Sequence, residues 1–281
     1  MIRTPAEARQ AELLGRSWLG FLRRNGPTYV AARWHDMSYA AGNPVANYYA
    51  SAPLVAAVLN GREGIDTGPA PAAGMRKRLA TATVLPGATG GSRAFWFLDY
   101  CLYYPFVDGD GGLQDLDNTV PLPRYAGQGC QVMAVCQGTG LATGVVRITY
   151  TNSQGVAGRV GDTTLDLSVT PGVLASSLAA GVAHAAPGGP WLNLQAGDAG
   201  VRSIEQVEPL SAIGGIFALV IVKPLLMLGV PTATAAPVEV DSFADKTATA
   251  DFEHGAYLHT ISYANAAGAP AIVGCTKTIW G

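Results

Sequence analysis

Residues 95–106 read Phe-Trp-Phe-Leu-Asp-Tyr-Cys-Leu-Tyr-Tyr-Pro-Phe and hold seven of the 23 aromatic residues in the chain. With the period of two that a strand imposes, both faces of this segment carry large apolar side chains, so neither face suits water. Such a strand must be covered on both sides, either by a second sheet of the same chain or by a neighbouring subunit. The choice between these two covers governs the functional interpretation.

The composition predicts a mainly β protein with little surface charge. The 281 residues include 35 Gly and 18 Pro, and this abundance is typical of short strands joined by tight turns. Charged residues make up 14% of the chain and the net charge is −2, against about 25% charged residues in an average soluble domain. Lys and Arg are scattered apart from the run at 76–78, so we expect no nucleic-acid partner.

The sequence predicts neither secretion nor a membrane span. The N-terminus lacks the apolar run of a signal peptide. The most hydrophobic stretch, 210–230, is interrupted at Gly214-Gly215 and Lys223-Pro224, so it predicts a buried central strand that Pro224 ends. The four cysteines lack metal-ligand spacing and are expected to be free thiols of a protein assembled in a reducing cytoplasm: Cys101, Cys130, Cys136 and Cys275.

The chain divides into an N-terminal part, 1–75, and a β-sandwich domain, 76–281. Capping residues and apolar spacing predict a helix at 5–24, and a short helix is expected at 53–59. The aromatic segment 28–51 between them reads as an extended arm, which packs either on another subunit or on its own sandwich. Residues 61–74, rich in Gly and Pro, form the expected junction. Nine strands are predicted at 79–85, 93–104, 131–137, 143–152, 164–169, 201–207, 215–222, 255–263 and 271–279. They indicate an antiparallel β-sandwich of jelly-roll type.

Residues that could carry chemistry do not gather into a catalytic pattern. The carboxylates Asp108, Asp110, Asp115 and Asp117 match only part of a calcium loop, so a solvated turn is favoured over a structural Ca²⁺ site. The histidines are dispersed at positions 35, 184, 254 and 259, and no nucleophile elbow occurs. The glycine-rich stretch 87–91 opens no helix that could bind phosphate. We therefore predict no enzyme, no cofactor and no metal site.

What remains favours association. Low charge, aromatic side chains on both faces of one strand, an aromatic arm and a terminal Trp together supply several surfaces that subunits could bury. Each is also compatible with an ordinary core. The interface candidates are Trp18, Phe21, Tyr29, Trp34, Tyr48, Tyr49, Tyr103, Tyr104 and Trp280.

Several segments resemble a group of little-characterised virion structural proteins of tailed bacteriophages. They are 103–106 (Tyr-Tyr-Pro-Phe), 117–125 (Asp-Asn-Thr-Val-Pro-Leu-Pro-Arg-Tyr), 127–132 (Gly-Gln-Gly-Cys-Gln-Val), 197–204 (Gly-Asp-Ala-Gly-Val-Arg-Ser-Ile), 222–225 (Val-Lys-Pro-Leu), 254–258 (His-Gly-Ala-Tyr-Leu) and the final Trp280-Gly281. This resemblance implies a particle component located in the virion, either a head decoration or cement protein or a tail- or fibre-associated subunit. It carries no residue-by-residue role.

The leading hypothesis is a head decoration protein that forms homo-oligomers, including a trimer, and binds other virion proteins such as the major capsid protein. The alternative is a tail-associated module in which exposed aromatic side chains of the arm, or Tyr103, Tyr104 and Tyr125, stack on sugars of a receptor. A glycan hydrolase ranks last, because no carboxylate pair supports it.

Overall fold

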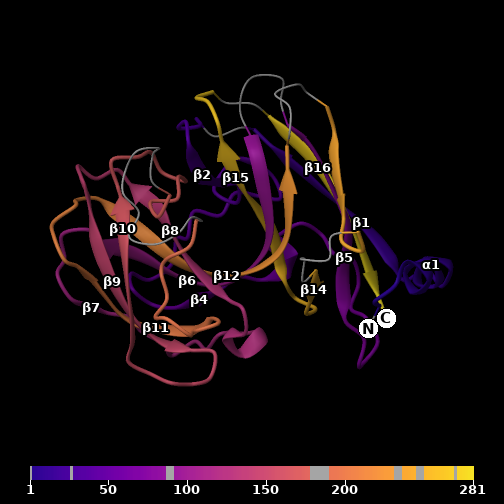
Figure 1. Cartoon of the computed structure of the whole chain (residues 1–281), viewed down its shortest axis with the longest axis horizontal. Helices are drawn as coiled ribbons and strands as arrows, with labels where there is room; N and C mark the ends of the chain where they lie inside the picture. The colour runs from indigo at the N-terminus through magenta and orange to yellow at the C-terminus, as the bar shows by residue number, and fades with distance from the viewer. Residues whose placement is uncertain are drawn as a thin grey trace.

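The computed structural model describes residues 2–25, 28–86, 92–177, 190–230, 236–244, 250–268 and 271–281 (Figure 1). His184 and the glycine-rich stretch 87–91 lie outside these residues. The fold is mainly β and its paired strands are antiparallel, consistent with a β-sandwich, so this part of the predicted class is confirmed and the jelly-roll type stays a prediction. Each of the nine predicted strands corresponds to an observed one: β5 (Lys77–Pro86), β6 (Ser92–Asp108), β8 (Gln131–Gly138), β9 (Thr143–Asn152), β10 (Arg159–Asp166), β11 (Val201–Pro209), β12 (Ile216–Gly229), β15 (Tyr257–Ala264) and β16 (Ile272–Trp280).

Three sheets are present. The terminal sheet has the order β13-β5-β16-β1-β3, with β14 pairing β5; its further strands are β13 (Val238–Asp241), β1 (Ser17–Arg24), β3 (Gly42–Asn43) and β14 (Asp251–Phe252). The central sheet has the order β2-β15-β6-β12-β8, with β4 pairing β6; it adds β2 (Arg33–Asp36) and β4 (Ala57–Val58). The outer sheet has the order β10-β9-β11-β7 and adds β7 (Gln114–Asp115). Two short 3-10 helices, η1 (Gly61–Glu63) and η2 (Tyr125–Gly127), lie in connections.

The long strands β6 and β12 belong to two sandwiches at once. Figure 1 shows this pair between the terminal sheet on the right and the outer sheet on the left. Near the start of β6, Phe95 and Phe97 pack into a core with the terminal sheet; further along, Tyr104 and Val107 pack into a core with the outer sheet. The strand therefore needs apolar side chains along its whole length.

The opposite face of the central sheet is also covered by the same chain. Leu98, Tyr100 and Tyr103 of β6 pack there against Tyr49, which comes from the segment between β3 and β4. The same cluster includes Trp34 of β2 at its margin. Both faces of the aromatic strand are thus covered within one subunit.

The predicted helix at 5–24 is wrong in its second half. The observed helix α1 (Pro5–Leu13) begins with the expected capping box: Glu7 N donates to Thr4 Oγ1 (3.2 Å), and Thr4 N donates to Glu7 Oε2 (3.0 Å). Gly15 then adopts a φ of +68°, which ends the helix. From Ser17 the chain is β1, because pairing along its whole length with β16 gives a ladder that local helical spacing cannot match.

Two further expectations are corrected. Residues 53–59 form no helix and instead supply β4, which pairs with β6. Pro224 does not end β12, which continues to Gly229. A register shift between Pro224 and Leu226 interrupts the ladder beside the residue that lacks an N–H, so the strand tolerates the proline.

The N-terminal part, residues 1–75, contributes strands to sheets that also contain strands from later in the chain. β1 pairs with β16 and β2 pairs with β15, so two of the sheets combine strands from either side of residue 75. The division of the chain at residue 75 stays a prediction. No helix among the described residues is long and apolar enough to cross a membrane.

Candidate functional site

The nine predicted interface residues separate into a buried and an exposed group. Five belong to the subunit's own core: Tyr29, Tyr49, Tyr103, Tyr104 and Trp280. Trp34 is half-buried and its ring lies 5.5 Å from that of Tyr263. Trp18, Phe21 and Tyr48 are exposed. Only these three are placed where another molecule could reach them without rearrangement of the fold.

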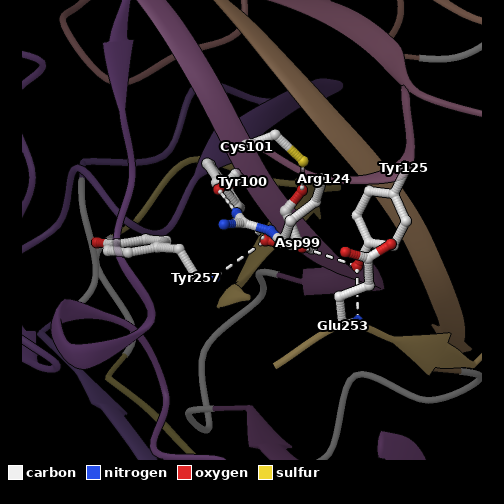
Figure 2. Close-up of polar contacts among 7 residues, drawn as sticks. All are labelled: Asp99, Tyr100, Cys101, Arg124, Tyr125, Glu253 and Tyr257. Atoms are coloured by element: carbon white, nitrogen blue, oxygen red, sulfur yellow. Dashed lines mark hydrogen bonds and ion pairs between the residues drawn. The ribbon is translucent and has the colours of Figure 1, made fainter. Parts of the chain in front are cut away.

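A buried carboxylate, Asp99, organises the most prominent polar network (Figure 2). Arg124 donates two hydrogen bonds to its carboxylate, from Nε to Oδ2 (2.7 Å) and from Nη2 to Oδ1 (2.8 Å). The Tyr125 hydroxyl also donates to Oδ2 (2.8 Å), and the Tyr257 backbone N–H donates to Oδ1 (2.9 Å). Asp99 therefore holds β6, the loop before η2 and β15 together.

Burial raises the pKa of Asp99, and the charge and hydrogen bonds of Arg124 oppose that rise, so the ionised carboxylate depends on its contact with Arg124. Burial opposes the charge on Arg124, but the adjacent Asp99 carboxylate outweighs it and raises the pKa of the guanidinium. Burial, followed by the charge of Asp99, raises the pKa of Tyr125, so its phenol stays protonated and donates. With two charged and two neutral donors in place, the carboxylate has no vacant direction for a substrate, and the network is structural.

A second buried carboxylate, Asp36, lies on the other face of the central sheet. It accepts hydrogen bonds from the hydroxyls of Tyr49, Tyr100 (2.7 Å) and Ser38 (2.8 Å), and from the Ser38 N–H (2.8 Å). Burial, followed by the charge of Asp36, raises the pKa of Tyr49 and of Tyr100 well above the ordinary value. These phenols therefore stay protonated and donate throughout the physiological pH range. The hydrogen bonds to Asp36 link the segment that follows β2 to strand β6.

Arg24 forms a third buried contact that the sequence did not reveal. Its Nη1 donates to the Ala40 carbonyl (2.7 Å) and its Nη2 contacts His259 Nε2. Burial, followed by the charge of Arg24, lowers the pKa of His259 well below its usual value, so the imidazole is neutral. Both side chains are fully buried, and we assign the pair to packing.

The four aspartates considered for calcium are exposed and act locally. Asp108 and Asp117 accept backbone N–H bonds two residues on, at Asp110 and Thr119. Asp110 accepts from Gly214 N, and Asp115 accepts from the Gln206 side chain. Across the described ranges, no group of three potential metal ligands gathers in one place.

Sequence reasoning missed the buried polar residues of these networks. Asp99 could have been recognised, since a carboxylate inside an apolar strand requires a buried partner. Arg124 and Asp36 carry no comparable signal, because nothing in their sequence neighbourhood sets them apart from surface residues. Arg24 was assigned to a helix and so could not have been placed.

The strongest candidate for a functional surface is the outer face of the terminal sheet. Leu19 and Phe21 on β1, Val273 on β16 and Leu85 on β5 are 38–62% exposed. The register places Val273 beside Leu85 on one flank and beside Arg23 on the other, while Phe21 lies beside Cys275 and Leu19 beside Lys277. The four apolar side chains therefore share one face of the sheet, with Arg23 and Lys277 between them. We call Leu19, Phe21, Leu85 and Val273 the apolar face.

A groove of about 620 Å³ adjoins this face along the edge of β1. Its lining comprises residues 18–21, Asn43, Pro44, Val45, Glu63, Gly64 and Asp66. The large apolar members, Trp18, Leu19, Phe21 and Val45, are all exposed, and the carboxylates of Glu63 and Asp66 lie beside them. An apolar groove with a polar wall suits a protein segment better than a small charged substrate.

The comparisons with known proteins return no match: no family model, no curated protein and no solved structure resembles this chain closely enough to be accepted. The resemblance to phage virion proteins therefore stays a prediction. Any functional conclusion has to be argued from the geometry above.

Proposed function

We propose that this protein is a non-catalytic structural subunit of a bacteriophage particle, a head decoration protein that assembles with copies of itself. The observation that carries the proposal is the apolar face. A monomer in water gains nothing from exposing Leu19, Phe21, Leu85 and Val273 together on one sheet, whereas burial between subunits stabilises by about 25 cal/mol for each Å² of apolar surface.

The buried networks support a structural role. The carboxylates of Asp99 and Asp36 are each engaged by several donors within the fold, which leaves them committed to stability. The low fraction of charged residues, 14%, also reduces repulsion between copies packed at high density. The jelly-roll topology, which is common in viral shell proteins, is part of this proposal.

The proposal is tested by the oligomeric state and by shell binding. Analytical ultracentrifugation of the purified protein is expected to show concentration-dependent homo-oligomers. Phe21→Ser is expected to weaken self-association at least about tenfold, because it removes a large side chain from the apolar face. Leu141→Ser is the matched control: Leu141 is 92% exposed but lies in the turn between β8 and β9, so its loss should change nothing.

A monomer at every concentration, with no binding to virion shells, would overturn the proposal. Unchanged association of Phe21→Ser would instead remove the apolar face from it. Both results are readable from the same sedimentation runs.

The alternative, a tail-associated module that binds receptor sugars, has less support. Tyr103 and Tyr104 are buried, and the hydroxyl of Tyr125 is engaged by Asp99. Trp18 and Phe21 are exposed aromatic side chains that line the groove and could stack on a sugar there, and Trp18 has the larger ring system. A glycan array with wild-type protein and Trp18→Ala tests this, since selective binding lost in the variant would favour the alternative.

A further inference from the structure

The free edge of β1 has a defined hydrogen-bonding pattern. Trp280 N donates to Arg16 O on the β16 side, and Asn25 N donates to Ala41 O on the opposite side. Because backbone groups alternate in direction along a strand, the even-numbered residues of β1 bond to β16 and the odd-numbered ones point away. β3 pairs only with Arg23 and Arg24. The N–H and C=O groups of Ser17, Leu19 and Phe21 therefore face the groove, and no backbone bond to them occurs within the described residues.

This edge lacks the usual protection. Natural edge strands carry Lys, Pro, bulges or inward charges that discourage further pairing. Residues 17–21, by contrast, read Ser-Trp-Leu-Gly-Phe, pair with β16 in unbroken register and carry no charge. β3 stops at Asn43, before Pro44, and so leaves this stretch open. An uncharged, regular and apolar edge is a template for another strand.

We propose that this edge pairs with the same edge of a second copy, β1 against β1 in antiparallel register centred on Leu19. The inference rests on the proposed self-assembly and names its contact. Odd-numbered residues then meet across the two-fold axis: Leu19 faces Leu19, and Ser17 faces Phe21 of the second copy. The two terminal sheets become one continuous sheet, and the apolar faces of both copies lie on the same side of it.

The other side of β1 makes the self-pairing complementary. In this register Trp18 stands opposite Gly20 of the second copy, so its indole approaches the segment that covers that glycine. Gly20 lies against the segment that carries Glu63 and Asp66, since a Cβ placed on it would meet Ile65 and Asp66. The indole N–H of Trp18 and the carboxylate of Glu63 have no hydrogen-bond partner among the described residues. Pairing brings such a donor towards such an acceptor twice, once in each copy.

Cysteine cross-linking tests the register directly. In a Cys275→Ser background, Leu19→Cys should form an intermolecular disulfide under mild oxidation, because facing residues of a hydrogen-bonded antiparallel pair lie about 5.5 Å apart at Cα. Val273→Cys is the matched control: Val273 is 47% exposed on the same apolar face but sits on the interior strand β16, so it should not cross-link.

A second variant tests the backbone hydrogen bonds of the proposed strand pairing. Leu19→Pro removes a donor that points into the groove and costs no bond to β16, so it should raise the Kd of self-association at least about tenfold. Leu19→Lys should act in the same direction, and it keeps the backbone intact if the proline variant does not fold. Circular dichroism and thermal unfolding establish whether each variant is folded.

The outcomes separate this inference from the proposed function. Wild-type oligomers with no Leu19→Cys dimer, or with efficient Val273→Cys dimers, overturn the edge pairing and leave self-assembly standing through another contact. A wild-type protein that is strictly monomeric and binds no virion shell overturns both. A monomer that binds shells only when Leu19 is intact assigns the edge to a strand of a different protein and likewise overturns pairing with a second copy.

Discussion

The central and terminal sheets are both rich in apolar strands, yet they use them differently. In the central sheet, Phe97 and Tyr100 on opposite faces of β6 are both fully buried by segments of the same chain. In the terminal sheet, Leu22 is buried whereas its neighbour Phe21 is 62% exposed. The segment richest in aromatic residues thus lies in the core of the molecule. The surface available to a partner is instead a sheet face with exposed apolar side chains next to an unpaired strand edge.

Two ion pairs repeat this contrast with the same geometry. Arg124 and Asp99 form a bidentate pair inside the molecule, and Arg147 and Asp162 form one of similar length on the outer sheet, with both side chains 41% exposed. Water screens the second pair and not the first. The comparison therefore isolates the effect of burial.

The largest expected effect comes from breaking the buried pair. Asp99→Ala leaves the Arg124 guanidinium without its partner and should lower the free energy of unfolding by about 3–5 kcal/mol. Asp162→Ala is the control and should cost less than about 1 kcal/mol. Urea denaturation measures both variants, and equal losses would contradict the expected effect of burial on the ion pair.

A smaller effect should appear with pH. Burial, followed by the charge of Arg33, lowers the pKa of His35 on β2 to about 4. The unfolded chain binds a proton near pH 6.5 and the folded chain does not, so stability is complete above that pH and falls as the pH drops from about 6.5 to about 4. The loss is about 1.4 kcal/mol for each pH unit while only the unfolded state is protonated. His259, also buried and neutral, acts in the same direction.

The measurement is the free energy of unfolding against pH for the wild type and for His35→Gln. Between about pH 6.5 and pH 4, the free energy of unfolding of the variant should fall less steeply than that of the wild type, by about the 1.4 kcal/mol per pH unit that one proton contributes. His254→Gln is the matched control: burial, followed by the charge of Lys77, also lowers the pKa of His254, but this side chain is exposed, so its substitution should change the slope less than His35→Gln does. An unaltered slope in His35→Gln would place this imidazole in contact with water.

Much of this fold could be predicted from the sequence where local pattern and long-range pairing agree. The alternation in residues 143–152 gave the bounds of β9 correctly, and the apolar run 215–222 was recognised as a buried strand. The pattern failed where tertiary pairing overrides it. Residues 17–24 satisfy helical spacing and strand alternation equally, and only β16, some 250 residues later, decides between them.

The candidate site was less predictable for the same reason. Trp18 and Phe21 were identified as interface residues, but so were Tyr49 and Tyr104, which are buried. Hydrophobicity alone cannot tell a side chain covered by its own chain from one that awaits a partner. The distinction depends on where a sheet ends, and the edge of β1 is visible only when β3 is seen to stop at Asn43.

The smallest expected effect on stability concerns the apolar face itself. Phe21→Ser should change the free energy of unfolding of the isolated subunit by no more than about 0.5 kcal/mol, because the side chain is already exposed in the folded subunit. Leu22→Ser on the same strand should cost at least about 2 kcal/mol, since it empties part of the core shared with the central sheet. Denaturation at concentrations too low for association measures both. If Phe21→Ser were as damaging as Leu22→Ser, then Phe21 would be stabilising its own subunit, and the apolar face would have no surface left to offer a second copy.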